Sequence, residues 1–170
     1  MEKRDLYDIN RIPTGETILK GETIPSDRYI VVVLAFIQNL YGKFLVQKRS
    51  VQKDGKYALT GGHPKSGETS SQGMITQIKE ELGLDINKNE LELIFSGRED
   101  SHHVFFDIYF IKKNFNIDDL ILQKEEVDFV QWNSMSEILS MIENDLFLDN
   151  HSEEVYRFID IFKERGIYFE

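Results

Sequence analysis

The apolar, β-branched run Tyr29–Ile37 constrains the fold of this chain more than any other segment. Such a run lacks the polar alternation of a half-exposed strand, so it indicates a strand that is buried on both faces. The turn residues at Asn39–Gly42 and the alternating segment Lys43–Lys48 follow directly. We expect these segments to form a hairpin with the buried strand.

The remaining segments predict layers on either side of that strand. Further strands are expected at 91–96, 104–111 and 127–132, and helices at about 69–83, 134–143 and 152–165. The order is mostly strands, one central helix, more strands and two helices. This order predicts an α+β or layered α/β/α domain rather than a parallel βαβ repeat.

The length of 170 residues indicates one domain, which we place at 1–170. Within it, residues 1–27 form an N-terminal extension that should pack on the domain, and residues 134–170 hold the C-terminal helices. Disordered segments contain few apolar residues, whereas segment 1–27 contains several, so we expect it to be ordered.

Charge and composition exclude several classes of protein. The formal net charge is −10, which argues against a general nucleic-acid binder and against docking on anionic lipid. The chain has no Cys, so thiolate nucleophiles and Cys-ligated zinc are absent. No apolar run approaches the ~18 residues of a membrane span, and the charged N-terminus is not a secretory signal. We therefore expect a cytoplasmic protein.

The loop and helix from Gly61 to Leu84 carry the most informative chemistry. On a helical wheel, Gln77, Glu80 and Glu81 gather on one flank beside the apolar face, and Glu68 lies in the preceding loop. Oxygen ligands of this kind suit Mg²⁺ or Mn²⁺. Such a cation would let an acidic protein bind a pyrophosphate.

This segment resembles the Nudix box, G-x5-E-x7-R-E-U-x-E-E-x-G-U, with seven of its nine specified positions matched over the 23 residues Gly62–Leu84. Outside the box, FLVQKRS, ALTGGH and EEVDFVQW are similar to the isopentenyl-diphosphate-isomerase-like branch of that superfamily. The resemblance implies the Nudix fold, a mixed β-sheet sandwiched between helices. It also implies metal-dependent hydrolysis of a diphosphate linkage in a nucleoside diphosphate joined to another group.

The resemblance also implies roles for individual residues. Glu80 and Glu81 would bind the metal, and the carbonyl of Gly61 would be a further ligand. Glu68 would support the loop or bind the metal through water. The expected cofactor is accordingly Mg²⁺, with Mn²⁺ as the alternative.

Two positions depart from the box: Thr76 replaces the Arg and Gln77 replaces the first Glu of the helix. A Gln carbonyl can still bind a metal weakly, but it cannot accept a proton from water at neutral pH. A general base is worth ~10²–10⁴ in rate, so activity should be reduced or the base should lie elsewhere. Glu125 and Glu126, just ahead of the strand at 127–132, are the leading substitutes. A loop with two further acids and two histidines is the second: Glu99, Asp100, His102 and His103.

Two further residues are candidates for substrate binding. Arg49 would contact a substrate phosphate, although an Arg at a strand end is as often a surface ion-pair partner. His63 follows the glycine pair, where it would contact substrate or stabilise the loop.

The sequence is compatible with two functions. The first is a Mg²⁺-dependent pyrophosphohydrolase that acts on a small-molecule phosphoanhydride, as a monomer or a homodimer. The second is a non-catalytic Nudix domain that binds a nucleotide or metabolite, which Thr76 and Gln77 favour. An isoprenyl diphosphate isomerase is disfavoured, because relatives with that activity use a catalytic Cys.

Overall fold

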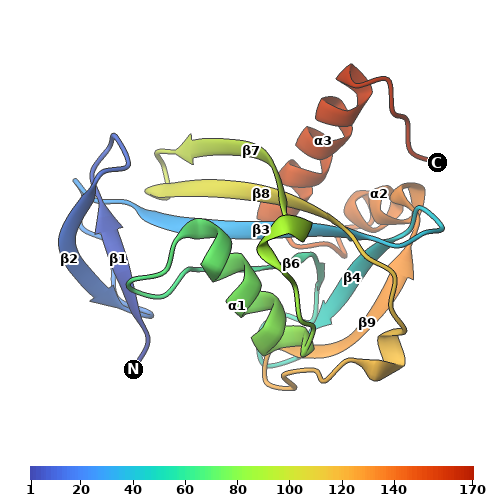
Figure 1. The fold of residues 1–170 in the computed structure, drawn as a ribbon, viewed down its shortest axis with the longest axis horizontal. Helices are drawn as coiled ribbons and strands as arrows, with labels where there is room; N and C mark the ends of the chain where they lie inside the picture. The colour runs from blue at the N-terminus through green and yellow to red at the C-terminus, as the bar shows by residue number, and fades with distance from the viewer.

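The computed structural model describes residues 1–170 as a mixed α+β fold (Figure 1). The nine strands are β1 Lys3–Tyr7, β2 Pro13–Leu19, β3 Ile30–Gln38, β4 Phe44–Arg49, β5 Tyr57–Ala58, β6 Thr60–Gly62, β7 Glu92–Glu99, β8 Val104–Lys112 and β9 Val127–Asn133. The three α-helices are α1 Ser70–Leu82, α2 Met135–Glu143 and α3 Asp149–Glu164. The 3-10 turns Lys88–Glu90 and Ile117–Asp119 complete the elements. Every strand and helix expected from the sequence is present, although α3 begins three residues earlier.

The β3 strand is the centre of a seven-stranded mixed sheet, as its composition predicted. It pairs in parallel with β8 along its whole length and antiparallel with β6. The path through the sheet runs β5-β4-β3-β8-β7, with β9 alongside β4. Only the β3–β8 pair is parallel; the other pairs are antiparallel.

The expected hairpin between β3 and β4 exists only at its turn. Gln38 pairs with Phe44, and beyond this pair β4 leaves β3 to run antiparallel to β9. The free length of β3 is then available to β6, whose Gly61 and Gly62 lie opposite Leu34 and Val33. This divergence brings the glycine pair to the middle of the sheet.

Two hydrophobic clusters lie on the two faces of the sheet. On one face α1 contributes Met74, Ile78 and Leu82, all fully buried. On the other face α2 and α3 cover a cluster of phenylalanines in which Phe36 and Phe158 stack at 4.0 Å between ring centroids. Figure 1 shows α1 in front of β3, and α2 and α3 at the opposite side of the sheet. The sheet is therefore a layer between helices.

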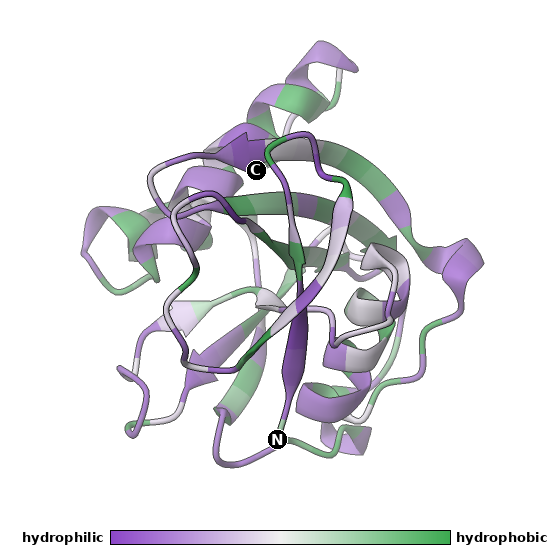
Figure 2. Ribbon diagram, turned by 90° about the vertical axis from the view of Figure 1, so that its left-hand side faces the viewer, coloured by the Kyte–Doolittle hydropathy of each residue, from purple (hydrophilic) through white to green (hydrophobic).

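The segment 1–27 forms a separate two-stranded antiparallel sheet from β1 and β2, here called the N-terminal hairpin. Figure 2, in which this hairpin faces the viewer, shows hydrophilic residues along much of it and long hydrophobic stretches on the main sheet. Leu6 is buried, and Tyr7 bridges to Tyr29. Arg11 forms a bidentate pair at 2.8 and 2.5 Å with Asp107, a buried carboxylate on β8.

Helix α1 begins and ends as its sequence predicted. Thr69 accepts a hydrogen bond from the backbone of Gln72, and the Gln72 side chain accepts one from the Thr69 backbone. Gly83 ends the helix in the left-handed conformation. No helix in the structure has the length and apolar character that a membrane crossing requires.

Candidate active site

The glycine pair allows loop 63–69 and helix α1 to pack closely against the sheet. A Cβ atom at Gly62 would lie 2.3 Å from the side-chain oxygen of Gln77, and one at Gly61 would lie 2.6 Å from a backbone carbonyl of β3. Gly61 therefore has no room for a side chain against the backbone of β3, whereas a side chain at Gly62 would force Gln77 to move. The Gln77 amide also donates to the carbonyl oxygen of His63 at 3.2 Å.

Glu68 holds loop 63–69 in place. One of its oxygens accepts from the backbone N–H of Lys65 at 2.7 Å, and the other accepts from the hydroxyl of Thr76 at 2.5 Å. Both oxygens are thus occupied within the protein, in keeping with the loop-supporting role among those predicted. Thr76, at the position of the Arg in the box, connects the loop to the helix.

Glu80 and Glu81 differ sharply in environment although they are adjacent. Glu80 is exposed and forms an ion pair with Lys65 of the loop. Glu81 is 7% exposed, and the one hydrogen bond to its side chain comes from the Gln47 amide at 3.3 Å. Burial raises the pKa of Glu81 to about 7; the nearby Glu126 carboxylate adds to the rise, while the bond from Gln47 opposes it.

The turn before β9 brings Glu126 to the end of α1. The backbone N–H of Gln123 donates to the carbonyl of Glu81 at 3.0 Å, which fixes the turn against the helix. The Glu126 carboxylate lies 2.6 Å from the ammonium of Lys53. Of the two acids predicted as substitute bases, Glu126 is the one whose charge contributes to the raised pKa of Glu81.

The two residues predicted to bind substrate lie beside different parts of α1: Arg49 acts electrostatically on Glu81, and the carbonyl of His63 bonds Gln77 in the middle of the helix. Arg49 donates to Asp54 at 2.9 Å, so its Nε already has a carboxylate partner. His63 is largely buried, and burial together with the cations Arg4, Lys20 and Lys53 lowers its pKa to about 4. His63 is thus a neutral imidazole at physiological pH.

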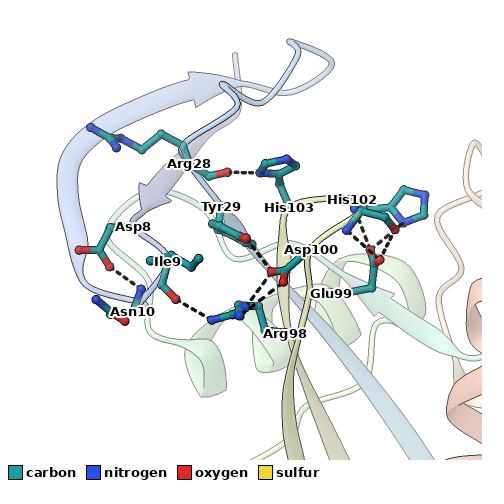
Figure 3. A network of polar contacts seen from close by, with 11 residues as sticks. Asp8, Ile9, Asn10, Arg28, Tyr29, Arg98, Glu99, Asp100, His102 and His103 are labelled. Carbon is teal, nitrogen blue, oxygen red and sulfur yellow. Dashed lines mark hydrogen bonds and ion pairs between the residues drawn. The ribbon is translucent and has the colours of Figure 1, made fainter.

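The second acid–histidine loop lies elsewhere, against the N-terminal hairpin. Figure 3 shows Asp100 accepting from the Tyr29 hydroxyl at 2.6 Å and from Arg98 at 2.8 Å, while Arg98 also donates to the carbonyl of Ile9. His102 bonds Glu99 within the turn at 2.7 Å. These side chains connect the hairpin to the β7–β8 turn.

Comparisons with known proteins agree with this geometry. A family model described as the NUDIX domain matches residues 28–157. The chain is 37% identical over 131 residues to an uncharacterized Nudix hydrolase of Listeria monocytogenes, which covers 75% of this chain and 76% of the relative. An uncharacterized Nudix hydrolase of Listeria innocua is 36% identical over 136 residues, or 78% and 79% of the two chains.

This chain belongs to the Nudix family. Its fold is similar to the crystal structure of DR0079 from Deinococcus radiodurans, with a TM-score of 0.76, 22% identity, and coverage of 92% of this chain and 98% of that one. The Nudix domain of Shewanella oneidensis NrtR, solved with ADP ribose, has a TM-score of 0.61 at 16% identity, covering 82% and 89%. The predicted Nudix fold, a mixed sheet between helices, is confirmed.

Nudix hydrolases generally use divalent metal ions, and the donor chemistry of this Nudix box fits such an ion. Glu81 is a buried carboxylate with a single long hydrogen bond, so it is poorly compensated for its loss of water. The structure contains no group of three or more acidic or histidine side chains placed to hold a metal ion, and Glu80 is paired with Lys65. Binding a cation through both acids would therefore require Lys65 to release Glu80.

Three partners of this Nudix site were not found from the sequence. Gln47 could have been found, because strand alternation puts it on the same side of β4 as Leu45, which faces α1. Lys53 and Lys65 lie in loops, where no periodicity indicates the direction of a side chain. Their pairing with Glu126 and Glu80 depends on tertiary structure alone.

Proposed function

We propose that this Nudix chain hydrolyses a diphosphate linkage in a nucleoside diphosphate joined to another group, with Mg²⁺ or Mn²⁺. The observation that carries the proposal is the Glu81 carboxylate, buried at the end of the box helix with a pKa raised by burial to about 7. A buried acid held near neutrality is typical of a catalytic site. The segments FLVQKRS and ALTGGH support placement in the isopentenyl-diphosphate-isomerase-like branch.

Glu80, Glu81 and the carbonyl of Gly61 would hold the cation in this proposal. When bound, a divalent cation neutralises the diphosphate and activates the attacking water. Glu68 acts through the loop, because both of its oxygens already accept hydrogen bonds from Lys65 and Thr76. Gln77 keeps the carbonyl of His63 in place and does not move a proton.

Glu126 is the proposed acceptor of the proton from water. It lies outside the helix, it influences the Glu81 carboxylate, and Lys53 keeps it oriented at 2.6 Å. Its carboxylate can therefore supply the base that Gln77 cannot. Arg49 would reach a substrate phosphate by exchanging its Asp54 partner, and neutral His63 would offer a hydrogen bond without adding charge.

A turnover screen tests this function. The wild type is incubated with Mg²⁺ or Mn²⁺ and a panel of nucleoside diphosphate compounds that includes ADP-ribose, the ligand of the NrtR Nudix domain. We expect metal-dependent release of a nucleoside monophosphate, with kcat lowered at least about a hundredfold by Glu81→Gln or Glu126→Gln. The exposed Glu153→Gln on α3 is the matched control and should retain wild-type rates.

A second function, a non-catalytic binding domain, is favoured by one observation. The Gln77 amide donates to a backbone carbonyl where the Nudix box has an acid, so the site carries one carboxylate fewer. Saturable nucleotide binding without turnover on any member of the panel would favour this function and exclude the hydrolase.

A further inference from the structure

Arg4, on β1, is the arginine of this chain without a hydrogen-bond partner. The chain has seven arginines, and each of the other six donates to a carboxylate. The Arg4 side chain is only 13% exposed, and its Nε is fully buried. The carboxylate of Glu2 lies 3.9 Å from that nitrogen, which is too far for a hydrogen bond.

Arg4 lines a small pocket between the N-terminal hairpin and loop 63–69. Lys65 and Glu68 of the loop and Asp5 and Tyr7 of the hairpin form the other polar walls. The cavity volume is about 10 Å³, which is at the lower limit of the space needed to hold one water molecule. A single oxygen atom fits this pocket, whereas a whole phosphate group does not.

The two carboxylates that line the pocket do not accept hydrogen bonds from Arg4. Asp5 accepts from the Ser66 hydroxyl at 2.6 Å and from the Gly67 backbone at 3.0 Å. Glu68 accepts from Lys65 and Thr76, as described above. The acids beside Arg4 are therefore used to hold the loop, and the guanidinium donors remain available.

An arginine in this condition requires an explanation. A buried donor without an acceptor loses the water that it would bond in solution, and burial lowers the pKa of Arg4 accordingly. The cations Arg4, Lys20 and Lys53 also act together on His63, which follows the glycine pair, although the chain carries a net charge of −10. An anionic oxygen is the missing partner that this environment favours.

We propose that Arg4 binds a phosphoryl oxygen of the substrate diphosphate and so makes the N-terminal hairpin part of the substrate-binding site. This rests on the proposed function, because it takes the anion to be the diphosphate that the Nudix box acts on. Guanidinium donors match phosphate oxygens in geometry and charge. The pocket admits one such oxygen while the rest of the diphosphate lies outside it, toward the loop.

Direct binding of inorganic pyrophosphate tests the proposal without turnover. Calorimetric titration in the presence of Mg²⁺ compares the wild type with Arg4→Met, which keeps an apolar stem but removes every donor, and with Arg4→Lys, which keeps the charge. We expect Arg4→Met to weaken pyrophosphate binding by about ten- to a hundredfold. Arg4→Lys should fall between the two, because a point charge lacks the planar fork of donors.

Two controls separate binding from folding. Arg28→Met removes an arginine just beyond the hairpin whose partners are the exposed carboxylates of Glu16 and Asp27, and this variant should bind pyrophosphate as the wild type does. The affinity for Mn²⁺ should be the same in Arg4→Met and the wild type. The melting temperature of Arg4→Met should be equal to that of the wild type or higher, because the change removes an unpaired buried donor. Should Arg4→Met fail to fold, the weaker binding expected of Arg4→Lys carries the test.

The outcomes also distinguish this proposal from the proposed function. Arg4-dependent pyrophosphate binding without turnover on any substrate would contradict the hydrolase and support the Arg4 site. Hydrolysis with identical pyrophosphate affinity in wild type, Arg4→Met and Arg4→Lys would overturn the Arg4 site alone and leave the guanidinium bonded to water. A wild type that does not bind pyrophosphate at millimolar concentration would overturn it as well.

Discussion

The buried Glu81 carboxylate should make the metal-free protein less stable as pH rises, and Glu81→Gln should remove this loss. Burial raises the pKa of Glu81 in the folded protein to about 7, from an ordinary value of 4.5. The folded state then holds a proton that the unfolded state has released, so the free energy of unfolding falls between pH 4.5 and pH 7. Above pH 7 the folded protein carries the full cost of a buried charge.

The size of this cost follows from the difference between the two pKa values. The difference is 7 − 4.5 = 2.5 units, and at about 1.36 kcal/mol per unit the cost approaches about 3 kcal/mol at pH 8. At pH 5 it is only about 1 kcal/mol, since the unfolded carboxyl is then partly protonated. We assume a urea m-value of about 2 kcal/mol/M. The urea midpoint of Glu81→Gln minus that of the wild type should then rise by about 1 M from pH 5 to pH 8.

Urea unfolding in EDTA at pH 5, 6, 7 and 8 measures the effect as a difference between the two proteins. His63 and His151 have pKa values lowered by burial to about 4 and about 3, and they add a stabilising trend as pH rises. Because both histidines are present in both proteins, their contribution cancels in the difference. The urea midpoint of the variant Glu153→Gln, which changes an exposed residue, should depend on pH in the same way as that of the wild type. Parallel curves for Glu81→Gln and the wild type would refute the argument, since the buried carboxylate would then carry no cost.

Two other variants test the connections around loop 63–69. Gln77→Glu places a carboxylate against the His63 carbonyl in place of a donor, so it should destabilise the metal-free protein by about 1–3 kcal/mol while tightening Mn²⁺ binding; equal Mn²⁺ affinity in a titration would contradict this. Asp5→Ala removes two hydrogen bonds to the loop and should speed tryptic cleavage after Lys65 several-fold, measured by mass spectrometry, whereas the exposed Asp27→Ala should leave that rate unchanged.

Local signals were sufficient to predict helix α1 and its face. The capping residues Thr69 and Gln72 and the terminal Gly83 act within a few residues of one another, so their effect can be worked out from sequence. The position of Glu81 at the edge of the apolar face follows from helical geometry in the same way. The separation of β4 from β3 does not, because it depends on strands β6 and β9, which follow β4 in the chain.

The N-terminal hairpin illustrates the same limit on prediction. Its apolar residues indicated packing on the domain, but its contacts with loop 63–69 connect residues about 60 positions apart: Asp5 with Ser66 and Gly67, and Lys3 with Ser66. No pattern within residues 1–27 indicates those partners. The hairpin therefore adds a support for the Nudix loop that lies outside the segment matched by the family model, which begins at residue 28.

The two departures from the Nudix box are compatible with an intact loop, because both new side chains donate hydrogen bonds within it. The Thr76 hydroxyl donates to Glu68, and the Gln77 amide donates to His63, so the helix still holds the loop at two points. Neither Thr76 nor Gln77 carries a charge, so neither residue leaves an ion unpaired. With Thr76 and Gln77 at the positions of the Arg and the Glu, the flank of α1 has one carboxylate fewer, but the loop and helix that position Glu80 and Glu81 are preserved. A protein built this way lacks a ligand or a base but keeps the site, and in the proposed mechanism Glu126, outside the helix, accepts the proton.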